Sequence, residues 1–308
     1  MKRIVTRIIS VTAFASRSLW VIATAAILCA VPVATKSLPL FAKAPKTNTV
    51  SVKDENEAAR LFYTTSVSSA GVELFAIHVS GSKITTTDIG PTKGGACISL
   101  ALSPSGTLYS MCGALFGVQH LATIDPLTGL ATVFGLDVPG LAVMSIAFGP
   151  DGTLYAVGDC HPVNGQCDPD ADPKYNSLYT VDVRTGEFKP VGPTGAPQFF
   201  MDLALDRDGN MFGVTCALSP SAIPAILYRI DLATGKATKV VNLVGSNSVM
   251  GLAFGREGKL YATDFTQNPG LYLIDIKTGF EKAIAALPFG LSSSLELANP
   301  GEDERADQ

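Results

Sequence analysis

Four acidic residues lie where short apolar runs make a carboxylate unexpected. Asp202 and Glu296 stand inside such runs, in "MDLALD" and "SLELANP", whereas Asp159 and Asp264 end the runs "YAVGD" and "YATD". A carboxylate among apolar residues needs water, a cation or a hydrogen-bond donor. If the fold brings these four together, their oxygens suit a divalent cation such as calcium, with Asp159, Asp202 and Asp264 as the metal ligands. Such a cation could polarise a carbonyl group and activate water.

Three further side chains are candidates for contact with a ligand, namely His120, His161 and Phe199. The histidines lack the spacing of metal ligands, and core packing is the alternative for Phe199. The sequence contains no nucleophile elbow, phosphate-binding loop, dinucleotide fingerprint or paired-histidine zinc motif. It therefore favours a binding protein over an enzyme, and no cofactor is required apart from the cation considered above.

Cysteines point to an oxidising compartment. Five of the six lie beyond residue 34. If Pro104 and Ser105 form the tip of a hairpin, Cys97 lies opposite Cys112 at bonding distance. Cys160 and Cys167 could close a second loop, "CHPVNGQC". Disulfides of this kind are typical of exported proteins, although free buried thiols remain the alternative.

The elements that position these residues come from two alternating turn signals. The first signal occurs as "SPSG", "GPDG", "DRDG" and "GREG", and the second as "DPLTG", "DVRTG", "DLATG" and "DIKTG". Each signal recurs at intervals of forty-odd residues, apart from one longer interval that contains an insertion. A period of this length is typical of a repeat architecture. The aspartate that opens each second signal is expected to cap its own turn.

Between the turns lie short runs rich in β-branched and aromatic residues, four to a repeat, with no helical periodicity. Four short strands per repeat predict the blade of a β-propeller. The first repeat, residues 61–90, supplies only three strands, and "SLELANP" near the C-terminus resembles the innermost strand "SLALSP". We therefore expect an all-β, five-bladed propeller of antiparallel strands, closed by one blade shared between the two ends of the chain.

The tight turns between strands 1 and 2 and between strands 3 and 4 must emerge on one face of such a ring. The variable loops emerge on the other, and variable loops on a rigid scaffold are where binding usually occurs. Asp159, Asp202, Asp264 and Glu296 would converge near the mouth of the central channel on that face. The alternative is that Asp202 bonds neighbouring amides or serine hydroxyls and that Glu296 meets water in the channel.

The ends of the chain have different compositions from the repeats. Residues 1–34 carry Lys2, Arg3 and Arg7 before the apolar run 19–34, which predicts an export signal or a membrane anchor. Residues 35–59 are expected to be a linker, 60–300 the propeller, and 301–308 a disordered acidic tail. Without residues 1–34, 19 basic and 27 acidic residues remain, a net charge of −8 that disfavours nucleic acid as a partner.

The pattern "FGPDGTLYA" followed by "LYTVDVRTG" resembles the repeats of secreted bacterial β-propellers of the NHL, YVTN and gluconolactonase-like kind. The resemblance covers residues 61–300 and implies blade architecture more strongly than activity, because these families range from scaffolds to sugar lactonases. We expect an exported, periplasmic or extracellular monomer that binds a protein, peptide or small molecule on its variable face. The alternative is a metal-dependent lactonase with its carboxylate site at the channel mouth.

Overall fold

The computed structural model describes residues 60–298 except 70, 115–116, 139–140, 161–175, 216–223, 246–247, 265–268 and 290. The expected signal or anchor (1–34), linker (35–59) and acidic tail (301–308) lie outside the described residues, as do His161 and Cys167. Within the described part, no helix is long and apolar enough to cross a membrane.

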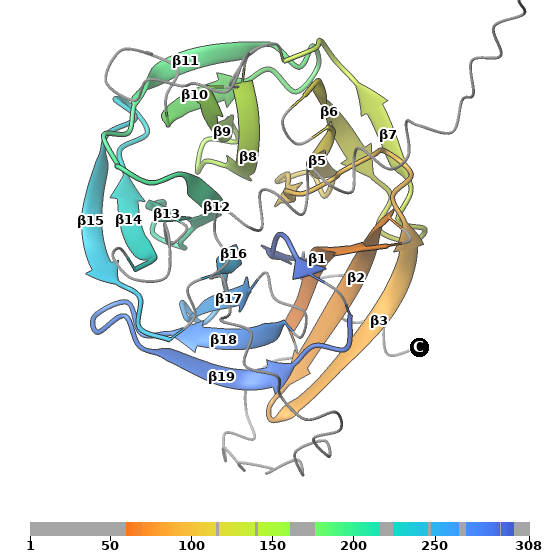
Figure 1. The fold of residues 1–308 in the computed structure, drawn as a ribbon, viewed down its shortest axis with the longest axis vertical. Helices are drawn as coiled ribbons and strands as arrows, with labels where there is room; N and C mark the ends of the chain where they lie inside the picture. Colours follow the sequence, from red (N-terminus) through yellow and green to blue (C-terminus); the bar gives the residue numbers. More distant parts are fainter. Residues whose placement is uncertain are drawn as a thin grey trace, which may run out of the picture.

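Five antiparallel sheets stand side by side around a central axis and form a β-propeller (Figure 1). We number the blades I to V in chain order. Blade I contains β1 (Arg60–Ser68), β2 (Gly71–Ser80), β3 (Lys83–Pro91), β20 (Leu291–Ser292) and β21 (Glu296–Leu297). Blade II contains β4 (Ala101–Leu102), β5 (Leu108–Gly113), β6 (Gln119–Ile124) and β7 (Ala131–Phe134), and blade III contains β8 (Leu141–Phe148), β9 (Leu154–Cys160), β10 (Ser177–Val181) and β11 (Phe188–Pro193). Blade IV contains β12 (Phe200–Leu205), β13 (Met211–Thr215), β14 (Ile226–Ile230) and β15 (Ala237–Asn242), and blade V contains β16 (Val249–Phe254), β17 (Leu260–Asp264), β18 (Gly270–Ile274) and β19 (Glu281–Ala286).

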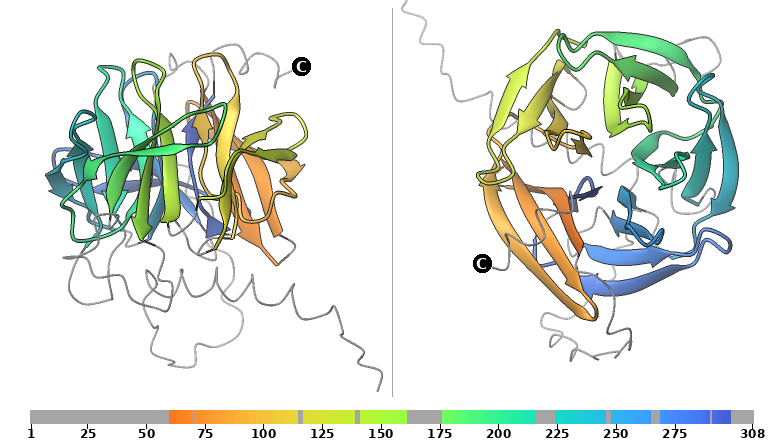
Figure 2. Two further views of the ribbon diagram at one scale, coloured as in Figure 1. Left: turned by 90° about the horizontal axis from the view of Figure 1, so that it is seen from above. Right: turned by 180° about the vertical axis from the view of Figure 1, so that it is seen from behind.

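The two ends of the propeller meet in blade I, as the sequence predicts. β20 and β21 both pair with β1, and together they occupy the innermost position of the blade, beside the three N-terminal strands (Figure 2). Hydroxyl groups at the end of β20 and just after it also lie close to hydroxyl groups of β1. Thr65 Oγ1 lies 3.0 Å from Ser293 Oγ, and Thr64 Oγ1 lies 2.8 Å from Ser292 Oγ. The five-bladed ring with a shared blade is therefore confirmed.

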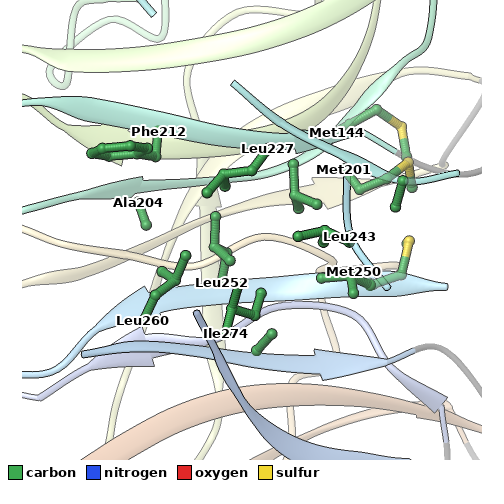
Figure 3. Close-up of a cluster of buried hydrophobic side chains, with 14 of the residues drawn as sticks. Met144, Met201, Ala204, Phe212, Leu227, Leu243, Met250, Leu252, Leu260 and Ile274 are labelled. Atoms are coloured by element: carbon green, nitrogen blue, oxygen red, sulfur yellow. The ribbon is translucent and has the colours of Figure 1, made fainter. Parts of the chain in front are cut away.

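The core is divided among the interfaces between blades. Among the described residues there are five buried hydrophobic clusters. Four of them join two neighbouring blades each, and the fifth lies between blades IV and V and also includes residues of blades II and III. In the cluster between blades IV and V, Leu227 of β14 packs with Leu252 and Leu260 of β16 and β17 (Figure 3). Because every sheet buries both faces against its neighbours, its strands are apolar throughout their inner and middle positions.

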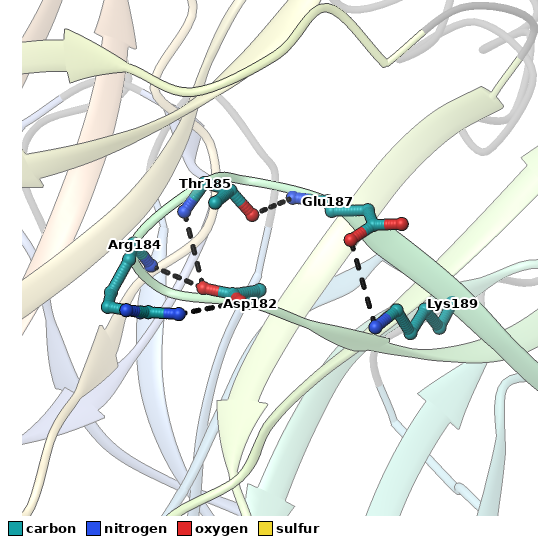
Figure 4. A network of polar contacts seen from close by, with 5 residues as sticks. All are labelled: Asp182, Arg184, Thr185, Glu187 and Lys189. Atoms are coloured by element: carbon teal, nitrogen blue, oxygen red, sulfur yellow. Dashed lines mark hydrogen bonds and ion pairs between the residues drawn. The ribbon is translucent and has the colours of Figure 1, made fainter.

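The turns between the third and fourth strands are built alike in blades II to V. In blade III, the Asp182 carboxylate accepts hydrogen bonds from the N–H groups of Arg184 (2.8 Å) and Thr185 (3.3 Å) (Figure 4). Gly186 follows with a φ of 71°, which a side chain would disfavour. The same aspartate-to-amide bonds recur at Asp125, Asp231 and Asp275. The capping role that the sequence predicts for these aspartates is thus confirmed.

A disulfide joins Cys97 to Cys112, as the sequence predicts, although the expected register is wrong at the turn. The strand residues nearest the turn pair as Leu102 with Leu108, one position away from a hairpin centred on Pro104 and Ser105. The register shifts further along, where Ile98 N–H donates to Met111 O, and this shift brings the cysteines opposite each other. The bond anchors an innermost strand of only two ladder residues. The side chain of Cys160, like Cys167, lies outside the described residues.

Loss of this disulfide is expected to lower the free energy of unfolding by about 3 kcal/mol, because the bond closes a loop with a sequence separation of 15. A double variant, Cys97→Ala with Cys112→Ala, should show this loss in urea denaturation monitored by circular dichroism. Wild-type protein measured with a reductant present is the matched control. Equal stability of the oxidised wild type and the double variant would contradict the prediction.

Candidate functional site

One residue in each of three inner strands lies at an irregularity of the ladder, towards the loop side of the channel. The register shifts at Met144 in β8, at Met201 in β12 and at Met250 in β16. These methionines, which Figure 3 labels, belong to one buried cluster that also contains Ile98 of blade II. Four blades of a ring can meet only at its axis, so these side chains form an apolar plug across the channel. We call these four residues the methionine plug.

Asp202 follows the plug directly and is 2% exposed. Its Oδ1 accepts hydrogen bonds from Ser145 Oγ (2.6 Å) and from the N–H of Leu203 (3.0 Å), and its Oδ2 accepts one from the N–H of Leu252 (2.6 Å). The partners come from blades III, IV and V. This is the hydrogen bonding to amides and a serine hydroxyl that we considered as the alternative to metal binding.

Glu296 is close enough to Asp202 for their charges to interact, so the structure brings these two candidates together. Burial raises the pKa of Asp202 to about 8, although hydrogen bonds from Ser145, Leu252 and Leu203 oppose the rise. Burial, followed by the negative charge of Asp202, raises the pKa of Glu296 well above its ordinary value. Protonation of Asp202 in the folded chain is thus favoured near neutral pH.

A cavity of about 300 Å³ opens at the other end of the channel, on the face of the tight turns. The ends of all five inner strands line it, including Leu102, Phe148, Leu205, Phe254 and Glu296. Arg256, in the first turn of blade V, completes the lining, and its Nη2 donates to the carbonyl oxygen of Ala298 (2.8 Å). The described part of the channel therefore combines a carboxylate, a guanidinium and the backbones of five strands.

Asp264 is held within its own blade. It is buried, and its carboxylate accepts hydrogen bonds from the N–H of Gly270 (2.6 Å) and from the Tyr272 hydroxyl (3.2 Å). Burial and then the charge of Asp264 raise the pKa of Tyr272 to about 12. The backbone of Asp159 lies near the end of β9, and its side chain is not among those that the structure describes. Among the described residues, no three histidine, cysteine or acidic side chains are grouped as a metal site.

The remaining sequence candidates do not line the cavity. His120 begins β6 on the loop side, and its Nδ1 lies 3.5 Å from Asp137 Oδ1 at the surface. Phe199 is half-buried and packs against the cluster between blades IV and V, where core packing was the expected alternative. Their contact with a ligand stays a prediction.

The sequence analysis missed the methionine plug and Arg256. A signal for the plug was available, because Ile98, Met144, Met201 and Met250 occupy one column when "ISLALS", "MSIAFG", "MDLALD" and "MGLAFG" are aligned. In each aligned segment a large apolar residue precedes a smaller one, which is also the pattern of an ordinary strand with alternating residues. The aligned position therefore shows that these residues are equivalent, but not that the ladder is irregular there. Arg256 had no signal, since an arginine in a polar turn is common.

Stability is expected to fall as the pH rises from about 4 to about 8. The pKa of Asp202 is about 8 in the folded chain against an ordinary 3.8, so the folded state binds more protons than the unfolded state between these values. Glu296 acts in the same direction. Urea titrations should give a larger free energy of unfolding at about pH 5 than at about pH 8.

Asp202→Asn serves as the control for this profile, because it cannot ionise and should flatten the decline. Below about pH 4 the trend should reverse, since hydrogen bonds from backbone amides lower the pKa of Asp125, Asp182 and Asp275 and this stabilisation is lost in acid. A free energy of unfolding that increases from pH 5 to pH 8 would refute the prediction.

No protein-family model matches the sequence, and a search of curated proteins finds no match. Solved structures with a similar fold include a gluconolactonase from Xanthomonas campestris, 12% identical, which covers 76% of this chain and 78% of that chain with a TM-score of 0.47. TolB from Acinetobacter baumannii is 12% identical, with coverages of 79% and 67% and a TM-score of 0.46. Aldose sugar dehydrogenase from Streptomyces coelicolor, in its PQQ-bound form, is 19% identical, with coverages of 62% and 68% and a TM-score of 0.44. The likeness is one of fold alone, and the sheet topology of this chain establishes the propeller independently.

Proposed function

We propose that the chain is an exported propeller that binds a protein, peptide or small molecule with the loops on the face opposite the tight turns. The scaffold supports this role because one ring face repeats the same hydrogen-bonded turns, whereas the loops of the other face differ in length from blade to blade. A rigid ring with variable loops is suited to recognition. Binding of this kind needs no cofactor.

The observation that carries this proposal is that hydrogen bonds within the protein engage the candidate carboxylates. Asp202 accepts donors from three blades, and Asp264 accepts donors from its own blade, so the oxygens that catalysis would need are engaged in structure. A carboxylate saturated with protein donors contributes to rigidity more readily than to chemistry. Recognition by the loops is compatible with this arrangement.

Export is part of the proposal. The disulfide between Cys97 and Cys112 fits an oxidising compartment, and the basic and apolar residues 1–34 have the composition of an export signal or membrane anchor. Together these features support a periplasmic or extracellular location. The net charge of −8 beyond residue 34 argues against nucleic acid as the partner.

Photo-crosslinking in the source cells tests the loop face. Val118 lies in the loop between β5 and β6 and is 49% exposed, and Leu127, in a tight turn of the same blade, is 85% exposed. A photoreactive amino acid at position 118 should give a defined crosslinked adduct, and the same group at position 127 should give none. Adducts from position 127 alone would overturn the assignment of the face.

A lactonase is the second candidate, because Glu296 lines a cavity and both Glu296 and the nearby Asp202 have raised pKa values. In this hypothesis Asp202, Asp264 and Asp159 hold a divalent cation such as calcium. The purified chain would then hydrolyse gluconolactone in the presence of calcium, and Asp202→Asn would abolish the turnover. Hydrolysis at the uncatalysed rate, in the presence and absence of calcium, would remove this candidate.

A further inference from the structure

The inner edges of the blades present backbone N–H groups to the channel. At the turn-face end, four aligned inner-strand residues donate to the second strands: Ser103 to Thr107, Gly149 to Thr153, Asp206 to Asn210, and Gly255 to Lys259. Because N–H groups alternate in direction along an antiparallel strand, the residue before each donor points its N–H towards the axis. These inward residues are Leu102, Phe148, Leu205 and Phe254, with Leu297 in the closing strand.

A deeper set of inward N–H groups lies two residues earlier in each strand, and two of these groups donate hydrogen bonds to a carboxyl side chain. The N–H groups of Leu203 and Leu252 belong to this set, and both donate to the Asp202 carboxylate. The chain therefore shows with its own side chain that the oxygens of a carboxyl group on the axis can accept hydrogen bonds from the inward amides of this ring.

In the described ranges, only some of the inward N–H groups at the turn face have a hydrogen-bond acceptor. Hydrogen bonds from the N–H groups of Leu102 and Leu297 reach Glu296. For Phe148, Leu205 and Phe254, we find no acceptor of the N–H group among the residues that the structure describes. All three line the cavity of about 300 Å³. Convergent backbone N–H groups in a concave site are suited to an anion.

The side chains around these amides are consistent with an anionic ligand. Arg256 lines the cavity and supplies a permanent positive charge with several N–H donors. Glu296 lines the same cavity, and burial together with the charge of Asp202 raises its pKa well above the ordinary value.

We propose that the turn-face cavity binds a small organic carboxylate, held by the N–H groups of Phe148, Leu205 and Phe254 and by the Arg256 guanidinium. This site is separate from the loop face and does not depend on the proposed function. It lies on the opposite side of the methionine plug, so ligands of the two faces do not share a path.

Nuclear magnetic resonance of the full chain, with ¹⁵N-labelled phenylalanine and leucine, tests the site at its own atoms. Titration with acetate should move the amide protons of Phe148, Leu205 and Phe254 downfield in a saturable manner. Acetamide has the same shape without the charge and should not move them. Arg256→Gln should weaken acetate binding about tenfold.

Arg207→Gln is the matched control, because Arg207 occupies the equivalent turn position of blade IV and does not line the cavity. It should leave acetate binding unchanged. Glu296→Gln keeps a donor without the charge and should retain binding. The proposal is wrong if the three amides do not respond to acetate, or if methylammonium moves them and acetate does not.

Discussion

A chain that ends at residue 290 is expected to lose its cooperative unfolding transition, because it lacks the strand that closes the ring. The missing segment contains Leu295, which is 1% exposed in the cluster between blades V and I, and it pairs with β1 at both ends. Its loss uncovers Phe62, which is fully buried in the same cluster. We expect a cost of about 5 kcal/mol or more, which is comparable to the whole stability of many domains.

Thermal unfolding followed by circular dichroism measures this effect. A chain that ends at residue 300 keeps the closing strand and should unfold like the full chain, which also tests the expectation that residues 301–308 form a disordered tail. A synthetic peptide of residues 291–300, added in excess, should restore part of the transition to the shorter chain. A sharp transition at the wild-type temperature in the chain ending at 290 would contradict the closure argument.

Asp202→Ala is expected to be the most destabilising single substitution in the channel, at about 3–5 kcal/mol. The variant leaves the Leu203 and Leu252 N–H groups and the Ser145 hydroxyl without their acceptor in a buried site. An unsatisfied buried polar group costs about 1–3 kcal/mol, and three are affected in three different blades. Urea denaturation at constant pH gives the free energy of unfolding.

Asp208→Ala is the matched control, because this aspartate follows in the same repeat and its side chain is 74% exposed. It should change stability by no more than about 0.5 kcal/mol. Asp202→Asn retains one acceptor oxygen and should fall between the wild type and Asp202→Ala. Equal stability of Asp202→Ala and Asp208→Ala would show that the hydrogen bonds of Asp202 do not hold the blades together.

The repeat alone determined the architecture. Gly129, Gly186, Gly235 and Gly279 recur because each tight turn needs a residue with positive φ, and this local requirement is readable from the sequence. The three strands of the incomplete first repeat and the lone "SLELANP" near the other end predict closure, because an unpaired radial edge is unfavourable. The bond between Cys97 and Cys112 was also predictable, since a hairpin limits which residues can be opposed.

Only the tertiary structure decided where the channel side chains act. The ladder irregularities at Met144, Met201 and Met250 turn three apolar residues onto the axis, and no local signal distinguishes such an irregularity from regular strand alternation. The meeting of Asp202 with the Leu252 N–H, 50 residues further along the chain, depends on how five blades are placed around one axis. Sequence patterns record the period of each blade, whereas the contacts between blades depend on ring closure and strand register. The cavity beside Glu296 and Arg256 follows from that closure and is visible only in the folded ring.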